Sequence, residues 1–144
     1  MRRQERGWNM TFLKRNFLWV AYFLFVAIAL ANKGPEPLFL SEGPYPLGKP
    51  IAWLLFAGFL AYSIYCSTKA SFIKSLPKIN QFIWARQIGI DLYLGVAMSL
   101  FIIYLNEGSL LVLLLWLVPV LIYANLAILL YVAMNYDSLI AHFV

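Results

Sequence analysis

The chain is poor in the groups on which most enzyme chemistry depends. Only 12% of its 144 residues are charged, whereas about a quarter are charged in a typical soluble domain. A single cysteine excludes an internal disulfide framework, and a single histidine excludes a haem or metal site built from several histidines of one chain. The phosphate-binding patterns GxxxxGK[ST] and GxGxxG are absent from the sequence. These absences argue against a redox, metal or nucleotide enzyme.

Apolar residues dominate what is present. They make up 63% of the chain, and the mean hydropathy is +0.79. A chain this short cannot bury so much apolar surface in a water-soluble core. Hydrocarbon also leaves backbone N–H and C=O groups without partners unless a helix satisfies them internally. The sequence therefore predicts an all-α integral membrane protein with several passes.

Four apolar runs predict four spanning helices, arranged as a four-helix bundle in one domain over residues 1–144. The expected helices cover approximately residues 12–31, 51–68, 87–105 and 109–135. The first and second are joined by an outer loop that holds five of the seven prolines, so neither a helix nor a central strand is expected there. This loop either rests on the lipid headgroups or forms a lid or docking surface. Pro119 predicts a bend in the last helix.

Basic residues predict the orientation, since cytoplasmic loops carry an excess of lysine and arginine. They cluster before the first apolar run and between the second and third, which places both termini in the cytoplasm. The expected location is the cell membrane, the inner membrane in a bacterium. Alternatively, the first run is a signal peptide cleaved after Ala31, which leaves three helices. The basic residues of the two clusters are Arg2, Arg3, Arg6, Lys14, Arg15, Lys69, Lys74, Lys78 and Arg86.

The net charge of +5 is thereby explained by topology, and no nucleic-acid partner is expected. Between Lys69 and Arg86, lysines alternate with apolar side chains. A basic amphipathic stretch of this kind is typical of a segment that lies on anionic lipid headgroups. The sequence thus predicts lipid contact for the whole chain and headgroup contact for this loop.

A polar cluster is expected inside the membrane. It comprises Arg86, Gln87 and Asp91 of the third helix and Asn125 of the fourth. An ionisable group in a spanning helix is a functional-site hypothesis by default. In one interpretation Asp91 is paired with Arg86, hydrogen-bonded to Asn125 and purely structural. In the other it titrates and carries a proton, a cation or a cationic substrate.

No catalytic, cofactor or metal residues can be assigned from the sequence. The favoured function is a non-catalytic membrane protein, either a subunit or scaffold of a membrane assembly or a homo-oligomer. The alternative is a small transporter or channel that uses Asp91 and Asn125, near the expected bend at Pro119. A lipid-acting enzyme completed by a partner ranks third.

Overall fold

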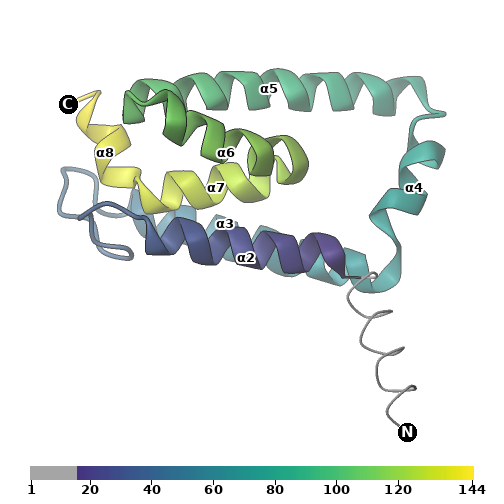
Figure 1. The fold of residues 1–144 in the computed structure, drawn as a ribbon, viewed down its shortest axis with the longest axis horizontal. Helices are drawn as coiled ribbons and strands as arrows, with labels where there is room; N and C mark the ends of the chain where they lie inside the picture. Colours follow the sequence, from purple (N-terminus) through teal and green to yellow (C-terminus); the bar gives the residue numbers. More distant parts are fainter. Residues whose placement is uncertain (1–15) are drawn as a thin grey trace, which may run out of the picture. The chain divides into compact units, whose positions relative to one another are not determined.

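A computed structural model describes residues 16–144, and all regular structure within them is helical. The chain divides into two compact units at Gly34 and Pro35. The first contains the described helix α2 (Phe17–Ala31). Figure 1 shows the helices of the second unit, which are α3 (Gly48–Lys69), α4 (Phe72–Ile79), α5 (Ile83–Glu107), α6 (Leu110–Tyr123), α7 (Asn125–Met134) and α8 (Tyr136–Ala141). The all-α prediction is confirmed for the described residues.

Two helices, α3 and α5, are long and apolar enough to cross a membrane. Their 22 and 25 residues span about 33 and 37 Å, against about 30 Å of hydrocarbon. In the most apolar stretch of each helix only 11% of the residues are buried, whereas the core helix of a soluble protein is mostly buried. The length, composition and exposure of α3 and α5 are compatible with a membrane location. The apolar helix α2 has 15 residues, which reach about 22 Å.

The last apolar run is not one helix, and the prediction of a continuous helix over residues 109–135 is wrong. It forms α6 and α7, with 14 and 10 residues, separated by Ala124. Figure 1 shows the two helices as a hairpin between α3 and α5, with α7 returning to the end from which α6 starts. At about 21 and 15 Å, neither helix is as long as the hydrocarbon is thick. A four-helix membrane bundle is therefore not confirmed.

The reversal is made by the backbone of Ala124. Its φ of 47° and ψ of −117° lie close to the first central position of a type II′ turn, which glycine normally occupies. Pro119, where a bend was predicted, lies inside α6 and is buried. The helix break is instead beyond it, where the sequence offers neither proline nor glycine.

A side chain of α5 marks how the hairpin lies against that helix. The Tyr93 hydroxyl donates a hydrogen bond of 3.1 Å to the carbonyl oxygen of Leu121. This carbonyl lies in the last turn of α6, where the break removes the usual helical N–H donors. The Tyr93 hydroxyl therefore replaces a backbone N–H donor that is lost at the break. The contact also positions the tip of the hairpin beside the first half of α5.

The hairpin changes the predicted position of the C-terminal segment. The His142 Nε2 atom lies 3.1 Å from the Asn106 Oδ1 atom, so α8 reaches the end of α5. We call this the loop end of the second unit, because residues 35–47 also lie there, and we call the opposite end the α4 end (Figure 1). In the second unit the C-terminal segment therefore lies at the loop end and not at the α4 end, whereas the predicted topology has both on one side of a membrane. Residues 1–15, with the predicted N-terminal basic cluster, lie outside the described residues.

Candidate functional site

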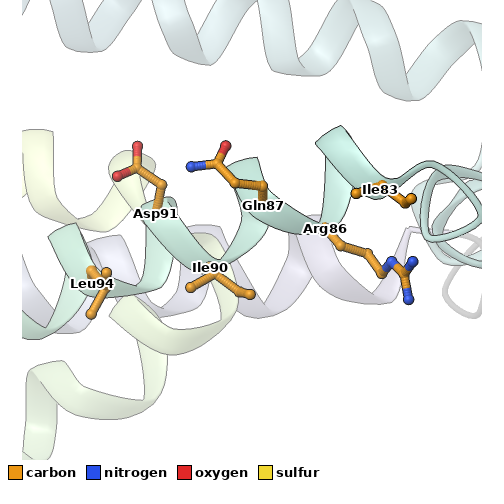
Figure 2. Close-up of a pocket in the computed structure, with 6 residues that line it drawn as sticks. All are labelled: Ile83, Arg86, Gln87, Ile90, Asp91 and Leu94. Carbon is orange, nitrogen blue, oxygen red and sulfur yellow. The ribbon is translucent and has the colours of Figure 1, made fainter.

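The predicted intramembrane cluster is only partly assembled. Helix α5 brings Arg86, Gln87 and Asp91 to one pocket, which Figure 2 shows. Asn125, the first residue of α7, does not line this pocket. No second element closes the pocket, because all its lining residues belong to α5: Ile83, Arg86, Gln87, Ile90, Asp91 and Leu94.

The predicted partners of Asp91 do not contact it. Across residues 16–144, no hydrogen bond or ion pair joins Asp91 to Arg86 or Asn125. Figure 2 shows the Asp91 and Gln87 side chains on the same side of α5, while the Arg86 side chain extends away from Asp91. The carboxylate of Asp91 therefore has neither of the two partners that the structural interpretation requires.

A different polar cluster, at the loop end, is built around a buried lysine. We name it the Lys49 cluster, comprising Glu36, Ser41, Lys49 and Asp137. The Lys49 side chain is fully buried, and its Nζ atom lies 2.6 Å from Glu36 Oε1 and 3.4 Å from Asp137 Oδ2. Its third acceptor is the Pro37 carbonyl oxygen. All three N–H donors of the ammonium group are thereby satisfied, as a buried charge requires.

The two carboxylates of this cluster also hold the start of α8. Glu36 accepts hydrogen bonds from the backbone N–H groups of Asp137 at 2.9 Å and Ser138 at 3.3 Å. These groups lie in the first turn of α8, where N–H donors have no partner within the helix and a negative charge is favourable. Ser41 in turn donates a hydrogen bond to Asp137. The proline-rich loop therefore supplies the N-terminal cap of a helix about a hundred positions away in the sequence.

The electrostatics of Asp137 follow from these contacts. Burial alone would raise the pKa of this carboxyl group. The hydrogen bond from Ser41 and the charge of Lys49 act in the opposite direction and prevail, so the pKa lies below its ordinary value. Asp137 is therefore ionised at neutral pH and balances the buried lysine together with Glu36.

A second set of polar side chains joins α5 to α7 and α8. We name it the Asn106 cluster, comprising Asn106, Glu107, Tyr131, Ser138 and His142. Asn106 donates to the Tyr131 hydroxyl at 2.7 Å, and that hydroxyl donates to Glu107 at 2.8 Å. The Ser138 hydroxyl donates to Asn106 Oδ1 at 2.8 Å. Because Ser138 also contacts Glu36 through its backbone, the two clusters form one continuous network.

The proline-rich loop is fixed at further points. Trp53 of α3 donates its indole N–H to the Leu38 carbonyl oxygen at 2.8 Å, and Tyr136 of α8 donates its hydroxyl to the Tyr45 carbonyl oxygen at 3.0 Å. A Cβ atom added to Gly48 would lie 1.8 Å from the Tyr136 hydroxyl oxygen. Only glycine lets the tyrosine approach α3 this closely.

The charged groups of this network are engaged with one another. Its carboxylates and its buried ammonium group already have partners, and the described residues include no group of three or more His, Cys, Asp or Glu side chains placed to hold a metal ion. Sequence reasoning missed both clusters, because their members come from segments far apart in the chain. The one available signal was the set of charged residues that border the apolar runs at Glu36, Lys49 and Asp137.

Comparison of the chain with protein-family models, with curated proteins and with solved structures found no match.

Proposed function

We propose that the chain is a non-catalytic integral membrane protein that serves as a packing subunit of a larger membrane assembly. In this proposal α3 and α5 cross the bilayer, and α6 and α7 form a re-entrant hairpin that enters and leaves on the same side. A closed helical hairpin is compatible with this depth, because it satisfies most backbone groups internally and is covered by neighbouring helices.

The observation that carries the proposal is the exposure of α3 and α5. Along the most apolar stretch of each helix only 11% of residues are buried, although these stretches consist almost wholly of aliphatic and aromatic side chains. Soluble monomers rarely expose contiguous apolar surface of this extent. Lipid or the apolar surface of a neighbouring subunit can cover this surface without exposing it to water.

The polar groups support a structural role. Those of the loop end join the proline-rich loop, α3, α5 and the hairpin into one network. Helix pairs in membranes lack a strong hydrophobic drive to associate, so hydrogen bonds and close packing position them. A network of this kind fixes the hairpin and presents a defined apolar surface to neighbours.

Charge distribution supports the orientation. The α4 end carries Lys69, Lys74, Lys78 and Arg86, and no acidic residue lies between Glu42 and Asp91. The loop end carries four carboxylates, on Glu36, Glu42, Glu107 and Asp137, and one lysine, Lys49, in the second unit. The excess of positive charge on cytoplasmic loops then places the α4 end in the cytoplasm and the loop end outside.

The experiment that tests the proposal is the native mass of the tagged protein, extracted gently from its own membranes, with co-purifying chains identified. We expect a complex that contains another chain, or further copies of this one, in a fixed ratio. A mass equal to one chain plus bound lipid and detergent, obtained in several mild detergents, contradicts a role as a packing subunit.

The second candidate is a small transporter or channel that uses Asp91 and Asn125. The helix break favours it, because interrupted helices in transporters expose backbone groups that bind substrates or ions. Ala124 begins such a break next to Asn125, and Asp91 is exposed in the pocket of Figure 2.

Proteoliposome uptake separates the two candidates. If Asp91 carries the cargo or a proton, Asp91→Asn abolishes uptake at unchanged protein yield, while Glu42→Gln, which neutralises an exposed carboxylate of the loop end, has no effect. If Asp91 has no transport role, both variants behave as the unmodified protein in this assay.

A further inference from the structure

Helix α4 is an amphipathic segment whose apolar face has no protein partner in the second unit. Phe72, Ile73, Leu76 and Ile79 recur at helical spacing on one face, while Lys74 and Lys78 lie on the opposite face. None of its residues is buried, and the exposed fraction reaches 59% for Phe72 and 64% for Ile73. A free helix of eight residues is too short to be stable in water, so its apolar face requires a covering surface.

The position of α4 in the chain defines which surface is available. It follows α3 after two residues and precedes α5, the two helices long enough to span a membrane. Figure 1 shows α4 joining the ends of these helices on the side away from the hairpin and the loop end. If α3 and α5 cross a bilayer, α4 lies at the height of its headgroups.

The residues that flank α4 are of the types found at the level of the headgroups. Tyr65 of α3 and Phe82 and Trp84 around the start of α5 are all exposed. Aromatic side chains with a polar edge are enriched where hydrocarbon meets headgroups. The ammonium group of Lys69 lies 5.6 Å from the centre of the Tyr65 ring, so a basic group and an aromatic ring occur together at this end of α3.

Every charged residue from Lys69 to Arg86 is basic. Within residues 16–144, Lys69, Lys74, Lys78 and Arg86 form no ion pair. Figure 2 shows the Arg86 side chain extending toward the start of α5, where α4 is attached. Basic side chains within about a Debye length, roughly 8–10 Å, of a negatively charged leaflet are attracted to it. The complementary surface is therefore an anionic one.

We infer that α4 is an interfacial anchor that inserts its apolar face into the cytoplasmic leaflet and binds anionic lipid headgroups through Lys69, Lys74, Lys78 and Arg86. The inference rests on the proposed membrane location of α3 and α5. It gives the chain a preference for anionic lipid that the apolar helices alone do not provide. Its consequence is that the lipid composition of one leaflet influences the position of the α3–α5 connection.

Depth measurements on the full chain test this inference. Replacing Cys66, the only cysteine of the chain, by serine gives a background for single labels at Phe72→Cys, Ser75→Cys and Met98→Cys. The protein is reconstituted in phosphatidylcholine vesicles and in mixed phosphatidylcholine–phosphatidylglycerol vesicles at equal protein-to-lipid ratio. Each position carries an environment-sensitive fluorophore, which is exposed in turn to a lipid-dissolved quencher and to aqueous iodide.

We expect the Phe72 label to be quenched from the lipid and the Ser75 label from water, with a contrast at least twofold larger in the phosphatidylglycerol vesicles. Added salt or the combined variant Lys74→Gln/Lys78→Gln removes that enhancement, whereas Lys33→Gln, which removes the same kind of charge after α2, retains it. Iodide quenching of Phe72 and Ser75 to the same extent in both vesicle types overturns the inference, and would leave the basic face free for an acidic protein.

The Met98 label distinguishes failure of this inference from failure of the proposed function. Met98 lies in the middle of α5 and is 69% exposed. If it is quenched from the lipid while Phe72 is not, only the anchor is wrong. If neither label is quenched from the lipid, the membrane location of α5 itself is wrong.

Discussion

Lys49 is the residue on which the loop end depends most. Its ammonium group is fully buried and reaches two carboxylates and a backbone carbonyl. Ion pairs taken out of water give little net stability, since desolvation offsets most of their attraction. Removing one partner is nevertheless strongly unfavourable, because it leaves the remaining charges without a counter-ion. Lys49 therefore contributes more to the specificity of the fold at the loop end than to its net stability.

Replacement of this lysine has a measurable consequence. We expect Lys49→Met to lower the free energy of unfolding by about 3 kcal/mol, the usual cost of breaking a buried pair. The measurement is thermal unfolding in detergent, with Lys33→Met as the control for loss of one exposed lysine. Adding Glu36→Gln to Lys49→Met should recover part of the loss, because it removes one of the two unbalanced carboxylates. Equal melting temperatures for the unmodified protein and Lys49→Met would refute the assigned role.

The same cluster predicts a pH dependence. The pKa of Asp137 in the folded protein lies below its ordinary value of 3.8, so its ionised form stabilises the fold. This stabilisation is fully present above about pH 4 and is lost as the pH falls through the folded-state pKa. Melting temperatures recorded from about pH 6 to pH 3 should fall more steeply for the unmodified protein and for Glu42→Gln than for Asp137→Asn. Parallel curves for all three proteins would contradict this interpretation.

Among the elements, the hairpin of α6 and α7 contains the main difference from the sequence prediction. The apolar runs of α3 and α5 were recognisable because hydropathy alone identifies long membrane helices, and the expected ranges of 51–68 and 87–105 fall within the observed Gly48–Lys69 and Ile83–Glu107. The last run is more apolar than either and carries no charge, so its composition is equally compatible with one long helix or two short ones. Proline is the usual signal for a break, but Pro119 lies within α6, and the reversal occurs at an alanine.

The two polar clusters could not be predicted from the sequence for a related reason. Glu36 and Asp137 are 101 positions apart, and Asn106 and Ser138 are 32 apart. Such pairings depend on the return of α7, which the sequence prediction did not include. The predicted cluster around Asp91 included contacts with Arg86 and Asn125 that residues 16–144 of the structure do not contain.

Ala124 provides a direct test of the reversal. Its positive φ is costly for any residue with a Cβ atom, by roughly 1–3 kcal/mol. Ala124→Gly relieves this cost and should raise the free energy of unfolding by about 1 kcal/mol after the greater freedom of glycine in the unfolded chain is deducted. Ala124→Val should lower it. If this segment were instead one continuous helix, Ala124→Gly would lower the free energy of unfolding, because glycine destabilises a helix interior relative to alanine.

For the whole molecule, the hairpin determines the number of crossings. If α3 and α5 cross a membrane, a re-entrant hairpin puts the α4 end and the C-terminal segment on opposite sides, whereas a last apolar run that crosses once puts them on the same side. This difference also governs the proposed role, since it decides which parts of the chain face partners on each side.

Labelling of intact cells with a membrane-impermeant thiol reagent measures this directly. In the Cys66→Ser background we expect Phe143→Cys, which is 85% exposed at the loop end, to react from outside. Ser75→Cys in α4 should react only after the membrane is opened. Reaction of both positions from the same side would show that the last apolar run crosses the membrane once and is not re-entrant.

The contacts of the network at the loop end can form only in a certain order while the chain is being synthesised. Glu36 and Lys49 emerge from the ribosome long before Asp137, which lies 88 positions after the lysine. During that interval the lysine has only part of its final set of acceptors, and the loop cannot yet cap α8. Docking of α8 is thus the step that completes the network, and a nascent chain arrested before it leaves Lys49 without its Asp137 partner. An unfinished chain therefore differs from a finished one in the charge balance around Lys49.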